Sequence, residues 1–153
     1  MKAEHINSFY KAVQEIFSLM LDLEVERGEL RVVDEMISGK DANVMLGVTG
    51  DLKGTIFFGF PKDMTLEMVK IMSGMEMSKI DKFVSSAMGE VVNIIGGNAL
   101  IDLNKYNYTC DITPPQIIIG ACESISMSDD KAISIPIKTP IGEFDINISL
   151  AEK

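Results

Sequence analysis

Residues 85–100, SSAMGEVVNIIGGNAL, lie in the middle of the longest helix that the sequence predicts, over residues 79–103. The apolar residues of this segment recur at steps of three and four, which is typical of a helix with one buried face. The same stretch contains Gly89, Gly96 and Gly97. Each glycine inside a helix costs about 1 kcal/mol relative to alanine, so these glycines need a structural or functional reason.

A helical wheel, drawn at about 100° per residue, separates the residues of this helix into two faces. The apolar residues share one broad arc, the predicted core face: Ile80, Phe83, Val84, Ala87, Met88, Val91, Ile94 and Ile95. Asn98 falls on the same arc, and we expect its side chain to be buried and hydrogen-bonded. A second group falls together outside the arc, within roughly 60° of one another: Ser86, Glu90, Asn93 and Gly97.

This second face carries only one carboxylate and one amide, beside residues with little or no side chain. A solvated face usually carries Lys, Glu and Arg, which favour the helix. One explanation is access, because another protein could then approach Glu90 and Asn93 closely. Ser86, Gly89 and Gly97 would be weaker contact positions. The alternative is that the small residues pack against another element of the same chain, and the spacing alone favours neither explanation.

The rest of the chain predicts a single domain, residues 1–153, of the α+β class. Helices are expected at residues 6–26, ended by Gly28, and at residues 63–73, ended by Gly74. The stretch VMLGVTGDLKGTIFFGF, residues 44–60, predicts two strands joined at Gly50 and Asp51. Further strands are expected at residues 30–34, 108–112, 116–122, 131–139 and 142–150. This order of elements favours an antiparallel sheet with the helices packed on one face.

Two of the later strands carry more specific expectations. In the last one, Phe144, Ile146, Ile148 and Leu150 alternate with polar residues and should share the core face. Pro136 cannot donate to a strand ladder, so it should face a sheet edge or a bulge.

Composition argues against several classes of function. The net charge is −9 with scattered basic residues, which argues against a nucleic-acid surface. No run of about 18 apolar residues suggests a membrane span, and the N-terminus lacks the layout of a signal peptide. Cys110 and Cys122 are too few for a disulfide framework, and free thiols suit a reducing cytoplasm.

The sequence does not predict a metal centre or a nucleophile. His5 is the single histidine and is expected on the surface, so neither a histidine metal cluster nor a Ser-His-Asp triad can be assembled. The acidic group Glu123, Asp129 and Asp130 is interpreted as a solvated loop rather than a cation site. The methionines of residues 68–77 are interpreted as core fillers, a common use of methionine.

The spacing Glu90-x-x-Asn93 on a helix, followed by DITPP at residues 111–115, resembles the CheC/CheX/FliY family of bacterial chemotaxis phosphatases. Within that family the resemblance is greatest to the CheX members, and it covers nearly the whole chain. Family members with two active helices carry a second E-x-x-N on the first helix. Here that helix offers Glu15 and, three residues later, Ser18, so the resemblance implies one site per chain.

The resemblance implies that the protein hydrolyses the aspartyl phosphate of a CheY-like response regulator. It also implies that Asn93 orients the attacking water and that Glu90 pairs with a lysine of the partner. Mg²⁺ would belong to the partner, so the chain would need no cofactor of its own. A cytoplasmic homodimer joined through strands is expected. In the family a small residue often precedes the asparagine, whereas this chain has Val92 at that position. Val92 lies on the flank of the helix toward the core, so it should not block the site.

Two alternatives remain open at this point. The first is a non-catalytic module of the same fold that binds a response regulator or a flagellar-switch component without hydrolysis. The second is an unrelated α+β dimerisation domain whose glycine-rich helix packs against a second copy of itself.

Overall fold

The structure is a computed structural model that describes residues 1–33, 36–37, 39–120, 125–126 and 132–152. The helices are α1 (Ala3–Leu21), α2 (Lys62–Ser73) and α3 (Lys82–Asn104). The strands are β1 (Glu26–Arg27), β2 (Arg31–Val33), β3 (Met36–Ile37), β4 (Ala42–Gly50), β5 (Leu52–Phe60), β6 (Cys110–Ile112), β7 (Gln116–Ile119), β8 (Ile125–Ser126), β9 (Ala132–Thr139) and β10 (Gly142–Glu152).

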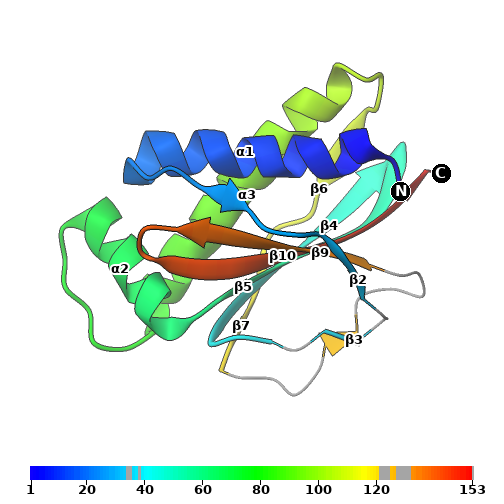
Figure 1. Cartoon of the computed structure of the whole chain (residues 1–153). Helices are drawn as coiled ribbons and strands as arrows, with labels where there is room; N and C mark the ends of the chain where they lie inside the picture. The colour runs from blue at the N-terminus through cyan, green and yellow to red at the C-terminus, as the bar shows by residue number, and fades with distance from the viewer. Residues whose placement is uncertain (34–35, 38, 121–124, 127–131, 153) are drawn as a thin grey trace.

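The main sheet is antiparallel, and its strand order is β1-β9-β10-β5-β4-β6. β2 pairs with β9 at one edge, β7 pairs with β4 at the other, and β3 and β8 form a small separate sheet. Figure 1 shows α1 above the main sheet, α3 running diagonally behind the strands in this view, and α2 at one end of the sheet. The predicted α+β architecture, with helices on one face of an antiparallel sheet, is therefore confirmed.

The core lies between this sheet face and the helices. β4 and β5 form the predicted hairpin, in which Gly50 takes a φ of 104°, a value that glycine adopts readily. The four apolar residues of β10 are at most 5% exposed, as expected for the core face, but Asn147 and Ser149 of the opposite face are buried as well. The four apolar residues pack with those of α1 and α3 in one continuous cluster.

Pro136 lies in β9, opposite an interruption in the neighbouring strand. Arg27 of β1 pairs with Ile137, whereas Arg31 of β2 pairs with Ser134. Between these two pairs, residues 28–30 lie opposite residues 135–136 of β9. Three residues opposite two is the arrangement of a bulge. This confirms the expectation from the missing N–H of proline.

The first helix is shorter than predicted, ending at Leu21 rather than near residue 26. Asp22 adopts a left-handed conformation (φ 54°), and its N–H donates to the carbonyl of Ser18 at 3.2 Å. The N–H of Leu23 donates to the carbonyl of Phe17 at 3.2 Å, which closes the helix end. α2 ends at Gly74 (φ 74°), as predicted.

The expectation for His5 is wrong, because its side chain is buried rather than on the surface. Its ring lies edge-on to that of Tyr108 with a centroid distance of 5.0 Å. The Tyr108 hydroxyl lies 2.9 Å from Glu4 Oε1 and 2.6 Å from Glu152 Oε1, which joins α1 to the end of β10. Burial lowers the pKa of His5, so the neutral imidazole is favoured at this position.

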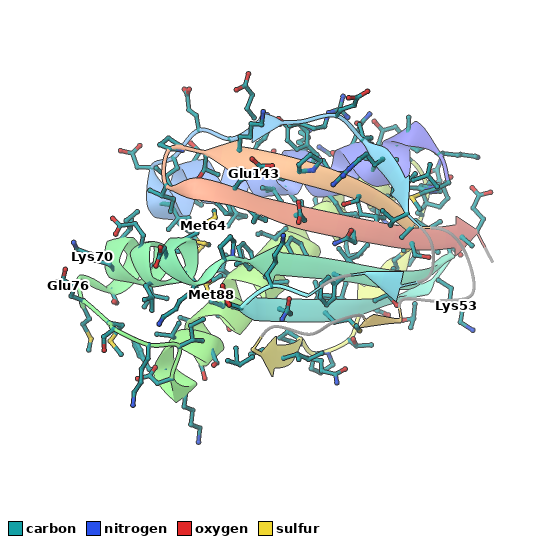
Figure 2. The ribbon with its side chains drawn as sticks, turned by 60° about the horizontal axis from the view of Figure 1, so that its bottom comes forward. Lys53, Met64, Lys70, Glu76, Met88 and Glu143 are labelled. Carbon is teal, nitrogen blue, oxygen red and sulfur yellow. The ribbon has the colours of Figure 1, made fainter. Side chains whose placement is uncertain are left out.

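The methionines fill the core near α2, as expected, with one exposed member. Of the methionines in residues 68–77, Met68 is fully buried and Met72 and Met77 are partly buried against the core, whereas Met75, in the loop after α2, is 52% exposed. Met64 and Met88, which lie outside that range, are at most 1% exposed. Figure 2 shows Met64 and Met88 inward of the ionic side chains Lys70 and Glu76 at the outer end of α2.

Some of the residues considered in the sequence lie outside the described part of the chain. The acidic group Glu123, Asp129 and Asp130 and the thiol of Cys122 are among them. Cys110 is half-buried, and its thiol is free.

Candidate functional site

α3 is a core helix that contacts α1 and α2 as well as β4, β6 and β7. Its predicted core residues Val84, Met88, Val91 and Ile95 are at most 1% exposed. Among the helices of the described residues, α3 alone is long and apolar enough to cross a membrane, a property that it shares with core helices of globular proteins. Of its most apolar 18-residue stretch, 44% is buried inside the protein. Asp81 Oδ1 accepts the N–H of Val84 at 2.9 Å and caps the start of α3.

The buried arc of α3 is rotated relative to the predicted one. Phe83 is 40% exposed, and Asn98 is half-buried without a side-chain hydrogen bond to any described residue, so both expectations are wrong. Val92 is fully buried. The cause is the packing of α3 against β6 and β7, which draws the core face toward Val92 and away from Phe83.

Two of the three glycines in α3 are explained by this packing. A Cβ on Gly89 would lie 2.8 Å from Ile117 Cδ1, and a Cβ on Gly96 would lie 2.7 Å from Leu46 Cδ1. Both glycines are buried against the sheet edge. The expectation that Gly89 belongs to the accessible contact surface is therefore wrong. Packing of α3 against a second copy of itself through these two glycines is also excluded, because side chains of the same chain already lie against both of them.

Gly97 differs, because a Cβ placed there meets nothing within 4 Å. Gly97→Ala should therefore stabilise the fold by about 0.5–1 kcal/mol through helix propensity alone. If the open position serves close approach of a partner, the same variant should bind that partner more weakly. Thermal melting and a partner-binding titration on one preparation measure both effects. A variant that is more stable and binds normally would show that the open space has no role in docking.

Glu90 and Asn93 lie about one turn apart on the outward side of α3. Glu90 and, one turn earlier, Ser86 are exposed, and Asn93 is half-buried. Among the described residues, no group forms a hydrogen bond or ion pair with the Glu90 carboxylate or the Asn93 amide. The structure thus brings Ser86, Glu90, Asn93 and Gly97 to one face, and its two polar groups are available to another molecule.

The segment that follows β6 flanks this face. The Gly47 N–H donates to Thr113 Oγ1 at 2.8 Å, and the Thr113 N–H donates to the Gly47 carbonyl at 2.9 Å, which fixes the segment on β4. Pro115 Cγ lies 3.8 Å from the position of a Cβ on Gly89. The small size of Gly89 therefore lets this proline-containing segment lie against α3 beside Glu90.

α1 is fixed to the far end of α3 by a polar contact. The Ser8 hydroxyl donates to Asp102 Oδ2 at 2.8 Å, and Lys11 Nζ lies 3.3 Å from Asp102 Oδ1. The hydrogen bond from Ser8 is the main cause that lowers the pKa of Asp102. Further along α1, Glu15 and Ser18 are exposed, and a serine stands at the position that Asn93 has relative to Glu90, so α1 does not repeat the arrangement of α3.

The described residues do not bring together three or more His, Cys, Asp or Glu side chains that could hold a metal ion. The chemistry that this face can supply is therefore that of one carboxylate and one amide. An amide offers both a donor and an acceptor, which suits the orientation of a water molecule. A carboxylate suits a cationic side chain.

Comparisons with known proteins agree on one group. The family described as chemotaxis phosphatase CheX matches residues 42–138. The CheY-P phosphatase CheX of Thermotoga maritima is 27% identical, over 98% of this chain and 97% of that protein. A CheC-like superfamily protein from Shewanella sp. PV-4 has a similar crystal structure, with a TM-score of 0.90, 26% identity and 99% of both chains covered.

A CheX from Borrelia burgdorferi, solved as a CheX-CheY-BeF₃-Mg²⁺ complex, is also similar. Its TM-score is 0.82 and its identity is 27%, with 97% of this chain and 98% of that chain covered.

Proposed function

The chain belongs to the chemotaxis phosphatase CheX family, and on that premise we propose that it hydrolyses the aspartyl phosphate of a CheY-like response regulator. The observation that carries the proposal is the outward pair on α3, in which the Glu90 carboxylate and the Asn93 amide lack partners among the described residues. A related CheX has been solved in complex with CheY. The substrate is therefore another protein, which is consistent with a convex helix face as the site.

Asn93 orients the attacking water. Hydrolysis of an aspartyl phosphate requires a water in line with the leaving carboxylate, and phosphoryl transfer depends mainly on positioning and on stabilisation of charge. Asn93 is half-buried on α3 and its amide has no hydrogen-bond partner among the described residues, so the amide is free to bind a water molecule.

Glu90 sets the register of the two proteins by pairing with a lysine of the partner. It is the single ionised group on this face, so a cation opposite it fixes the position of α3 along the partner surface. Mg²⁺ belongs to the response regulator in this scheme, as the Mg²⁺ in the related complex suggests. In this scheme the chain needs no cofactor of its own, and its site of action is the cytoplasm.

The test is phosphate release from a phosphorylated CheY-like regulator in the presence of Mg²⁺, with and without the protein. We expect release to be faster than the regulator's own hydrolysis and to rise with the concentration of the protein. Tight binding of the regulator without faster release would instead identify a non-catalytic binding module of the same fold.

We also propose that the protein is a homodimer joined at a sheet edge. Of the strands in the C-terminal third that belong to the main sheet, β9 and β10 are interior, so β6 and β7 remain as an edge. Ile119 of β7 is 44% exposed.

Light scattering at micromolar concentration should give twice the mass of one chain, and Ile119→Lys should shift the protein toward a monomer. Phosphate release per chain should be unchanged, because the outward face of α3 remains free in each subunit. A monomeric wild-type protein would contradict the proposal.

A further inference from the structure

The outward face of α3 is almost without charge. Between Phe83 and Ile101, a distance of about 27 Å along the helix, Glu90 is the single charged residue. Eight of the 17 residues between them are buried in the core, and of the nine that are exposed or half-buried only Glu90 is charged. The lack of charge extends well beyond the turn that holds Glu90 and Asn93, and the proposed chemistry does not account for it.

Two exposed apolar side chains lie at the ends of this neutral face. Phe83 is 40% exposed and Ile101 is 64% exposed. They are separated by about five full helical turns, so they fall on one line along α3, and Glu90 lies within about 20° of that line. Single exposed apolar residues are ordinary on protein surfaces. Here, however, two of them are aligned with the one charge of the face.

We propose that Phe83 and Ile101 are apolar anchors that bind the response regulator on either side of Glu90. This inference rests on the proposed function, because it assigns the same partner to a longer surface. A compact domain of about 100 residues has a radius of gyration near 13 Å, which corresponds to a diameter of roughly 34 Å. One such domain, centred on Glu90, is wide enough to cover both anchors at once.

The partner surface that fits this face has a cationic side chain between two apolar patches. Covering α3 from Phe83 to Ile101 removes water from one ionised group, Glu90, and the cation compensates for that loss. The rest of the contact is uncharged: burial of Phe83 and Ile101 is favourable, whereas Ser86 and Asn93 need hydrogen-bond partners in the interface. A partner that has the cation but charged groups at the anchor positions would be rejected, which gives the anchors a role in the choice of regulator.

The anchors contact the regulator far from the phosphoryl group, so they bind the ground state and the transition state equally. A residue of this kind lowers KM without changing kcat. Phe83→Gln and Ile101→Gln should therefore each raise KM for the phosphorylated regulator by roughly 5- to 30-fold, the usual range for interface anchors. The value of kcat should stay within about twofold of the wild type. Because the anchors are far apart, the double variant should show the product of the two single effects.

Val32→Gln is the matched control. Val32 is 63% exposed on β2, at the opposite sheet edge from the strands that α3 contacts. It should leave KM and kcat unchanged, and melting curves should show that all four variants are folded.

The same variants should be titrated against a regulator loaded with beryllium fluoride and Mg²⁺, which measures binding without turnover. Unchanged KM and unchanged affinity in both single variants would overturn the inference, even if the wild type is an active phosphatase. A wild type that binds the loaded regulator but releases no phosphate would refute the proposed catalysis. In that case the loss of affinity in the variants would still support the anchors.

Discussion

Asn93→Ala is expected to slow phosphate release from a saturating phosphorylated CheY-like regulator by about 100- to 1000-fold, while binding of the regulator persists. Removing one positioned hydrogen bond to the reacting groups typically has an effect of this size. The Asn93 side chain is short and makes no side-chain hydrogen bond to the described residues, so the fold does not depend on it. Phosphate release at saturation and a binding titration with beryllium fluoride-loaded regulator measure the two effects separately.

Asn98→Ala provides a matched control for this variant. Asn98 is also a half-buried asparagine of α3, but it lies outside the face that holds Glu90. Both substitutions replace asparagine by alanine in one helix, so both change helix propensity equally. Wild-type turnover in Asn98→Ala with near-complete loss in Asn93→Ala is the expected result. Normal turnover in Asn93→Ala would refute the assigned mechanism.

The sheet and the face of α3 could be predicted because both depend on local periodicity. Alternation placed the apolar residues of β10 on the core face, and the wheel placed Glu90 and Asn93 together on the outward side. The same wheel contained a further signal, because Gly89 and Gly96 are seven residues apart and therefore lie on one line of the helix. That line faces β6 and β7, which explains why both positions are glycine. Gly97 falls outside the line.

The errors concern features that depend on distant contacts. The burial of His5 depends on Tyr108 and on the end of β10, neither of which is near His5 in the sequence. The end of α1 depends on Asp22 in a left-handed conformation, for which glycine is the usual residue. The exposure of Phe83 follows from the sideways packing of α3 on the sheet edge. In each case the tertiary structure overrode a local preference.

Glu90 and Asn93 should differ in how their loss affects the reaction, and the difference separates docking from chemistry. Asn93 acts on the water, so its loss lowers kcat. Glu90 acts on a cation of the partner, so its loss should weaken binding as well as turnover, because the two active groups are then no longer held in register.

Glu90→Ala is therefore expected to lower kcat/KM by roughly 30-fold or more, the effect of truncating one member of a hydrogen-bonded charge pair across an interface. Glu90→Gln keeps the shape of the side chain and removes the charge, so most of this loss should remain. Glu143→Ala is the control, since Glu143 is exposed on β10 and its removal changes the net charge equally.

Salt dependence provides the sharpest test of the pairing by Glu90. At physiological ionic strength the screening length is about 8 Å, so added salt weakens an accessible ion pair but hardly affects apolar contacts. Wild-type affinity for the loaded regulator should fall as salt rises, and Glu143→Ala should show the same dependence. Glu90→Ala should bind weakly with an affinity that is nearly independent of salt, because the remaining contacts on the face are uncharged. If Glu90→Ala and the wild type have the same salt dependence, the cation that Glu90 contacts is not what fixes α3 on its partner.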